Sequence, residues 1–192
     1  MGRSTEERLG EILKGCLTGL IADLGAVPTL EKDLPAQALQ KIAGQPPIAA
    51  IIGFCNDELR GTLTLVGDRR LFARLFPTQP GMPSGPADVM DWAREFANLT
   101  VGRFRNRACA HGVNVRLSCP RSLSSEEIAA LDSRDTATPA SWVIGIEDMR
   151  FRAWLALDFL GPVTLLDEPP QSEDAAPEEG FVLMFSEAWQ AP

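Results

Sequence analysis

Two pairs of short apolar segments, each pair joined by a turn, restrict this chain to folds that contain an antiparallel sheet. Residues 48–55 and 59–66 are rich in β-branched and apolar side chains and flank a polar turn cluster. Residues 141–147 and 151–159 predict a second hairpin around Asp148. Hairpins that are separated by helical segments are typical of the α+β class, in which helices cover one face of an antiparallel sheet.

Helical segments lie before and between these strands, and three of them carry the clearest signals. Residues 4–24 begin with Ser4 and Glu7 at capping-box spacing, and their apolar side chains recur at steps of three and one, which predicts an amphipathic helix. The apolar stripe of this helix must be buried against the body of the chain or against a second copy. Asp68 caps a predicted short helix, and a long helix spans about residues 87–110.

The remaining segments are shorter. Residues 113–118 alternate between apolar and polar side chains and stop at Pro120, which predicts a half-buried strand. Residues 124–133 predict a surface helix, and residues 25–47 and 77–86 predict loops. The expected fold is therefore an α+β domain. Its antiparallel sheet comes from two hairpins plus one strand and is covered by the long central helix and the N-terminal helix.

The charge distribution divides the chain into a body and a tail. The formal charge is −8, and residues 167–192 contain seven acidic and no basic side chains, so residues 1–166 carry −1. We therefore predict one domain over 1–166 and an acidic, proline-containing C-terminal tail over 167–192. A near-neutral body lacks the clustered positive charge on which nucleic-acid affinity depends, so nucleic acid is not an expected partner.

Several other classes of protein are not supported by the sequence. No run of about 18 uncharged apolar residues occurs, so no membrane span is expected. The four cysteines are scattered, which is typical of a cytoplasmic protein. The chain has one histidine and no P-loop or dinucleotide-binding glycine pattern. Cys109, His111 and Cys119 do not have zinc spacing, and we predict no metal site.

The long helix presents two different faces. At about 100° per residue, one wide sector of small and apolar side chains must face the sheet. It contains Val89, Ala93, Phe96, Ala97, Thr100, Phe104 and Ala108. A separate polar sector contains Asp88, Asp91, Glu95, Asn98 and Gly102. Glu95 and Asn98 are neighbours at i, i+3, so a carboxylate and a carboxamide project side by side from the solvent face.

Such a polar pair is ordinarily a solvated surface, but two details favour a docking site. Gly102 costs about 1 kcal/mol in a helix interior relative to alanine, which indicates that something approaches closely there. Trp92 and Leu99 border the polar pair, where we expect them to be partly covered and to act as apolar anchors. The candidate site therefore consists of Glu95 and Asn98, with Asp91, Trp92, Leu99 and Gly102 as partner-binding residues.

These residues carry a resemblance to a known family. Residues 95–98 (EFAN), followed by Gly102 and a strand that reaches Pro120, resemble the E-x-x-N…G…P pattern of the CheC/CheX/FliY family of chemotaxis phosphatases. The hairpin over 142–159 falls where that family has one. The resemblance covers roughly residues 5–160, and the single E-x-x-N motif is most similar to CheX.

The resemblance implies both an activity and its partners. Glu95 and Asn98 would dephosphorylate the aspartyl-phosphate of a CheY-type response regulator receiver domain. CheX-type proteins pair as homodimers through their sheets, and no cofactor of the chain's own is expected, because Mg²⁺ is held by the receiver. The insertion near 124–138 and the acidic tail depart from the family pattern and leave the partner's identity open. The alternatives are a non-catalytic receiver-binding scaffold of the same fold and a plain dimerisation domain.

The two residue types suit this chemistry. An asparagine offers a donor and an acceptor without a charge, so it can hold a water in line with a phosphorus atom. A carboxylate aimed at the phosphoryl group would be repelled. Glu95 is better suited to bind a cation of the partner, such as its active-site lysine.

Overall fold

The computed structural model describes residues 3–31, 47–76, 85–132 and 140–166. The elements follow in the order α1 (Thr5–Asp23), β1 (Thr29–Glu31), β2 (Ile48–Cys55), β3 (Leu59–Gly67), α3 (Arg69–Arg74), α4 (Pro86–Ala110), β4 (Arg116–Leu117), β5 (Arg121–Ser122), α5 (Ser125–Asp132), β6 (Ala140–Ile146) and β7 (Met149–Phe159).

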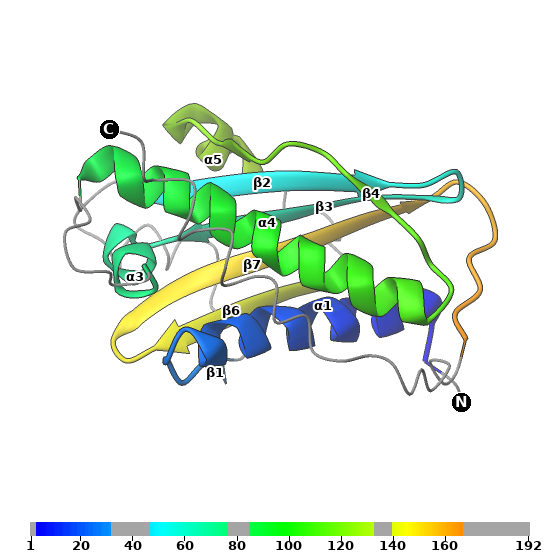
Figure 1. The fold of residues 1–192 in the computed structure, drawn as a ribbon. Coiled ribbons are helices and arrows are strands. Elements are labelled where there is room, and N and C mark those ends of the chain that lie inside the picture. The colour runs from blue at the N-terminus through cyan, green and yellow to red at the C-terminus, as the bar shows by residue number, and fades with distance from the viewer. Residues whose placement is uncertain (1–2, 32–46, 77–84, 133–139, 167–192) are drawn as a thin grey trace, which may run out of the picture.

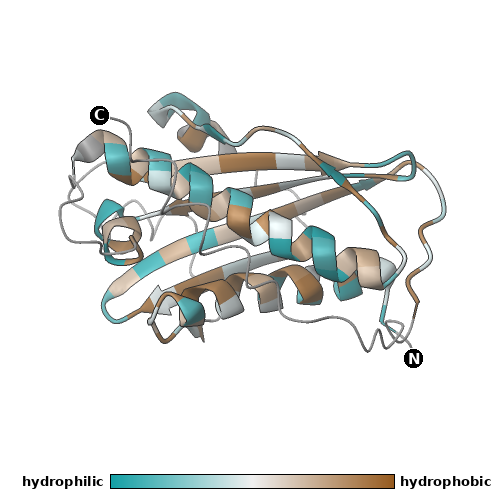
Figure 2. Cartoon of the chain, in the orientation of Figure 1, coloured by the Kyte–Doolittle hydropathy of each residue, from teal (hydrophilic) through white to brown (hydrophobic). Residues whose placement is uncertain are grey.

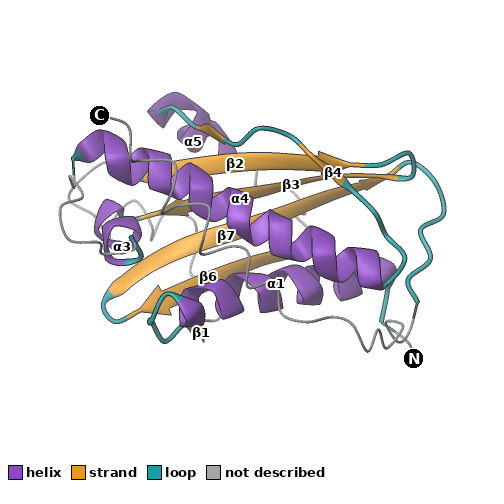
Figure 3. Cartoon of the chain, viewed as in Figure 1, coloured by secondary structure: helices purple, strands orange, loops and turns teal. Residues whose placement is uncertain are grey.

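The described strands form one antiparallel sheet. Their order is β1-β6-β7-β3-β2-β4, and β5 also pairs with β2. Helices α1 and α4 lie next to each other across one face of the sheet (Figure 1, Figure 3). Successive side chains of β2 point to opposite faces, so Ala50 and Ile52 belong to the core beneath α1 and α4. Ala49 packs instead with Val66 and with Ile128 of α5, which covers part of the other face.

Helix α1 begins at the predicted cap. The Ser4 hydroxyl accepts a hydrogen bond from the Glu7 N–H at 3.1 Å, and the Glu7 carboxylate accepts one from the Ser4 N–H at 2.9 Å. The apolar stripe of the helix is buried within the same chain. Its buried members are Leu9, Leu13, Cys16, Leu17, Leu20 and Ile21. Because the body of the chain covers this stripe, it gives no reason to require a second copy.

Helix α4 is seated on β2 through an aromatic contact. The rings of Phe54 in β2 and Phe104 in α4 lie 5.1 Å apart between centroids. The Phe54 ring reaches this position by lying over Gly61 of β3, where an added Cβ would collide with the ring. No side chain fits in that space, so glycine at this position lets the β2–β3 hairpin support the C-terminal half of α4.

After β7 the chain returns to the start of the domain. The Thr5 hydroxyl donates to the Val163 carbonyl at 3.4 Å, and the Arg8 guanidinium donates to the Leu166 carbonyl at 2.9 Å. The Leu166 N–H also donates to the carbonyl of His111, the C-cap residue of α4, at 3.0 Å. Both ends of the described domain therefore lie beside the C-terminus of α4 (Figure 1).

The α+β class, both hairpins and the helices agree with the sequence predictions, with two differences in the strands. Residues 25–47 were expected to be a loop, but Thr29–Glu31 forms an edge strand paired with β6. The strand predicted over 113–118 pairs only at Arg116–Leu117. The Ser118 N–H still donates to the Gly53 carbonyl at 2.9 Å, and Pro120, which has no N–H to donate, lies in the gap before pairing with β2 resumes at β5.

Some predictions fall outside the described residues, namely the acidic tail over 167–192 and most of the loops over 25–47 and 77–86. Among the helices that the structure describes, none combines the length and the apolar character needed to cross a membrane.

Candidate functional site

An aromatic cluster orients the N-terminal half of α4. Phe96 contacts Phe72 of α3 at 6.2 Å and Phe151 of β7 at 6.3 Å between ring centroids. Every residue predicted to face the sheet is buried, namely Val89, Ala93, Phe96, Ala97, Thr100, Phe104 and Ala108. Hydrophilic residues recur along α4 between the hydrophobic ones (Figure 2). The packing therefore turns the polar sector of the helix away from the sheet.

Trp92 is more deeply buried than predicted, because the sequence indicated a partly covered apolar anchor. Its side chain is only 7% exposed, and its ring packs between Phe76, at 5.6 Å, and Phe96, at 6.2 Å. The expected exposure is wrong because Phe76, which follows α3, covers this side of α4. Among the described residues the indole Nε1 has no hydrogen-bond partner. Trp92 thus belongs to the core that supports the polar sector from below.

Glu95 and Asn98 do lie side by side on α4. The Asn98 amide Nδ2 donates to the Glu95 Oε2 at 3.5 Å, and both side chains are half-buried. Partial burial raises the pKa of the Glu95 carboxyl above its ordinary value, and the hydrogen bond from Asn98 lowers it in part. The contact turns the amide nitrogen toward Glu95, which leaves the Asn98 Oδ1 available as an acceptor.

The remaining predicted site residues surround this pair. Asp91 is exposed and forms an ion pair with Arg94, its i+3 neighbour. Leu99 is partly buried against the main core. Apart from its two chain neighbours and the backbone of its own helix, no described residue comes within 4 Å of a Cβ built on Gly102, so the surface one turn after Asn98 is open. The structure therefore brings Glu95, Asn98 and Gly102 onto one accessible strip of helix.

One contact beside this strip joins the two helices. Arg103, the residue after Gly102, binds Asp23 at the end of α1, with Nη1 and Oδ2 2.6 Å apart. Both side chains are exposed, at 42% and 63%. Sequence reasoning could not find this pair, because eighty positions separate its members and neither belongs to a motif.

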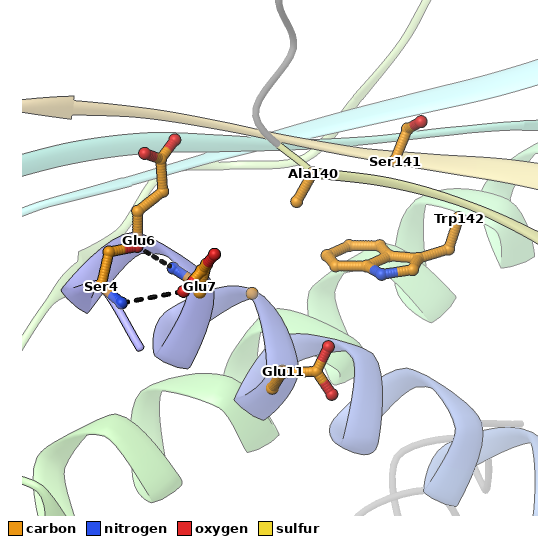
Figure 4. A pocket seen from close by; sticks show the side chains of 8 residues that line it. Ser4, Glu6, Glu7, Glu11, Ala140, Ser141 and Trp142 are labelled. Carbon is orange, nitrogen blue, oxygen red and sulfur yellow. Dashed lines mark hydrogen bonds between the residues drawn. The ribbon is translucent and has the colours of Figure 1, made fainter. Parts of the chain in front are cut away.

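A separate hollow lies between the start of α1 and the start of β6 (Figure 4). Its lining consists of Ser4, Glu6, Glu7, Gly10, Glu11, Ala140, Ser141 and Trp142. Two of its carboxylates already serve the helix. Glu7 completes the N-terminal capping box, and Glu11 forms an ion pair with Lys14. Most of the acidic side chains in this hollow therefore stabilise the first turns of α1.

The described residues contain no group of three or more His, Cys, Asp and Glu side chains that could hold a metal ion. Cys109 and Cys119 are exposed free thiols, and the His111 Nδ1 lies 2.9 Å from the Leu166 carbonyl oxygen. The chemistry that the α4 strip itself offers is that of an amide acceptor beside a half-buried carboxylate. Such a pair can position a water and bind a cation.

Comparison with known proteins decides the family. The family model described as chemotaxis phosphatase CheX matches residues 48–142, which include Glu95, Asn98 and Gly102. The chain belongs to the CheX family. No curated protein matches the chain in sequence.

Solved structures with the CheX fold are similar over most of the chain. CheX from Vibrio vulnificus matches with a TM-score of 0.60 at 12% identity, over 81% of this chain and 100% of that one. A CheC-like superfamily protein from Shewanella gives 0.54 at 13% identity, over 81% and 99%. The CheX-CheY-BeF₃-Mg²⁺ complex from Borrelia burgdorferi gives 0.51 at 12% identity, over 77% and 96%. At these identities the likeness establishes the fold of the CheX family.

Proposed function

We propose that this CheX-family protein hydrolyses the aspartyl-phosphate of a CheY-type response regulator receiver domain, with Glu95 and Asn98 as its catalytic pair. The single observation that carries the proposal is the contact between Glu95 and Asn98 on an accessible strip of α4, inside the residues that match the CheX model. The Borrelia relative was solved in complex with CheY, BeF₃ and Mg²⁺, which supports a CheY-like partner.

In this proposal Asn98 positions the attacking water. The water oxygen bonds to phosphorus while the bond between phosphorus and the aspartyl oxygen breaks, and the products are inorganic phosphate and a free aspartate carboxylate. The Asn98 Oδ1 accepts a hydrogen bond from the water, which directs a lone pair of the water oxygen toward the phosphorus. Because Asn98 is neutral, it approaches the anionic phosphoryl group without repulsion. Mg²⁺ in the receiver supplies charge neutralisation at that group.

Glu95 performs a different task in the same contact. Its half-buried carboxylate binds a cation of the partner, and this fixes the position of α4 against the phosphorylated residue. The hydrogen bond from Asn98 also holds the amide in one orientation before the partner arrives. Glu95 therefore contributes both to affinity and to the position of Asn98.

The test is phosphate loss from a stoichiometrically phosphorylated receiver encoded in the same genome. Asn98→Ala should lower the rate by about 10² or more while leaving affinity for a BeF₃-loaded receiver nearly unchanged, as expected for a positioning group. Glu95→Ala should weaken both affinity and turnover, and Glu95→Lys should weaken them further. Asn114→Ala is the matched control, because Asn114 is exposed beyond the end of α4.

Two outcomes would count against the proposal. Full activity in both Asn98→Ala and Glu95→Ala would place the active site elsewhere. Tight binding of the receiver by the unmodified protein without faster phosphate loss would show that it is a receiver-binding module without hydrolysis.

A further inference from the structure

Helix α4 is divided by charge along its length. Its first half carries three acidic residues, Asp88, Asp91 and Glu95, and one basic residue, Arg94, which is paired with Asp91. Its second half, from residue 99 onward, carries Arg103, Arg105 and Arg107 and no acidic residue. All three arginines are exposed. The division falls at Gly102, one turn after Asn98, so the proposed catalytic pair lies at the boundary between an acidic and a basic surface.

Two of these arginines flank the open surface at Gly102. Successive side chains on a helix differ by about 100°, so Arg103 projects to one side of Gly102 and Arg105 to the other. No described atom from outside the helix backbone and the two chain neighbours approaches within 4 Å of a Cβ at Gly102. A group of the partner that enters this gap would therefore lie between two guanidinium groups.

The positive charge at this position is only partly neutralised within the described residues. Arg103 is held by Asp23 at 2.6 Å. Arg105 contacts the neutral Asn106 side chain, at 3.3 and 3.4 Å, and forms no ion pair with a described carboxylate. One guanidinium is thus fixed beside the gap by a bond to α1, and the other is available to pair with an anion.

Stabilisation of the helix dipole does not explain Arg103 and Arg105. A basic side chain stabilises a helix mainly within its last turn, and in α4 only Arg107 lies there. The other two stand further from the helix end, next to the proposed site.

We propose that Arg103 and Arg105 form a clamp for an acidic group on the partner's surface next to its phosphorylation site. This inference rests on the proposed function. A site that holds Mg²⁺ and a phosphoryl group uses oxygen ligands, mostly carboxylates, so the receiver surface around it is anionic. With Glu95 on a partner cation and the clamp on a partner anion, α4 binds in one direction only. The clamp therefore determines which receivers bind and in which orientation they bind.

The experiment measures affinity of the full chain for a receiver loaded with BeF₃ and Mg²⁺, at several salt concentrations, together with kcat and KM for phosphate loss. Arg103→Glu and Arg105→Glu should each weaken binding by about tenfold or more at low salt, and the loss should shrink as salt rises. They should raise KM more than they lower kcat. Arg105→Lys keeps the charge and should retain most of the affinity.

Arg60→Glu is the matched control. Arg60 is an exposed β3 residue between Leu59 and Gly61, both of which are buried toward the helices, so its side chain points from the other face of the sheet. The control makes the same change in net charge away from α4. Thermal melts of all variants establish that each one folds.

The outcomes separate this inference from the function on which it rests. If the unmodified protein neither binds the receiver nor speeds phosphate loss, both are wrong. If it speeds phosphate loss and the clamp variants change affinity no more than Arg60→Glu, only the clamp is wrong. If Arg105→Glu binds the receiver more tightly than the unmodified chain, the arginines hold the chain's own acidic residues 167–192, and the clamp is again wrong.

Discussion

Replacing Gly102 with alanine should make the protein more stable and less active at the same time. Glycine in a helix interior costs about 1 kcal/mol relative to alanine, because it gives up more backbone freedom on folding. Beyond the chain neighbours of Gly102 and the backbone of its own helix, no described atom lies within 4 Å of the added methyl group, so no clash offsets this gain. We therefore expect Gly102→Ala to raise the free energy of unfolding by about 1 kcal/mol, which corresponds to roughly 2–4 °C in Tm for a domain of this size.

The stability part is measured by urea titration and thermal melts of the full chain. Gly19→Ala is the matched control, because Gly19 lies in α1 and likewise has no described atom within 4 Å of a Cβ. Both variants should gain a similar free energy. If Gly102→Ala lowers the urea midpoint and Gly19→Ala gains the expected free energy of unfolding, the space beside Gly102 is filled.

The functional part uses the same residue with a larger side chain. If the partner approaches closely at Gly102, Gly102→Ala should raise KM for the phosphorylated receiver, and Gly102→Leu should nearly abolish binding while the protein stays folded. Unchanged receiver affinity in a stable Gly102→Leu variant would refute the idea that this gap is part of the docking surface.

Three further predictions follow from the structure and the sequence. Burial raises the pKa of Glu95, so this side chain should be protonated at a higher pH than an exposed glutamate. As the pH is lowered, kcat/KM should therefore begin to fall at a higher pH than it would with an exposed glutamate at this position, and Glu95→Gln should remove this dependence. Light scattering at micromolar concentration should give twice the 20.8 kDa of one chain, and a monomer mass would contradict the homodimer expected from the CheX resemblance. Removing residues 167–192 should leave Tm nearly unchanged, because the acidic, proline-containing stretch over 167–180 has little apolar surface to bury; a large drop would place the tail in the core.

The features that the sequence predicted correctly are those set by neighbouring residues. The cap at Ser4 and Glu7, the two hairpins and the two faces of α4 all depend on spacings of a few positions. The strip that contains Glu95 and Asn98 also depends on neighbouring residues only, because the period of the helix places these two side chains together.

The features that it missed depend on contacts between distant segments. Trp92 lies at the edge of the polar sector by helical geometry, and only the position of Phe76 decides that its ring is buried. Strand β1 has three residues, and its pairing with β6 crosses more than a hundred positions. The bond between Asp23 and Arg103 likewise requires the packing of α1 on α4. No local pattern contains this information.

The closeness of the two ends of the domain makes it suited to circular permutation. Thr5 and Val163 are hydrogen-bonded, and Arg8 binds Leu166, so a short linker could join the ends of the described domain without disturbing the sheet. New termini could then be opened in the exposed β6–β7 turn at Glu147 and Asp148. A permuted chain that kept its far-ultraviolet spectrum would show that the order of elements along the chain is not needed for folding. The same geometry would let a host protein carry this domain as an insertion within one of its own loops.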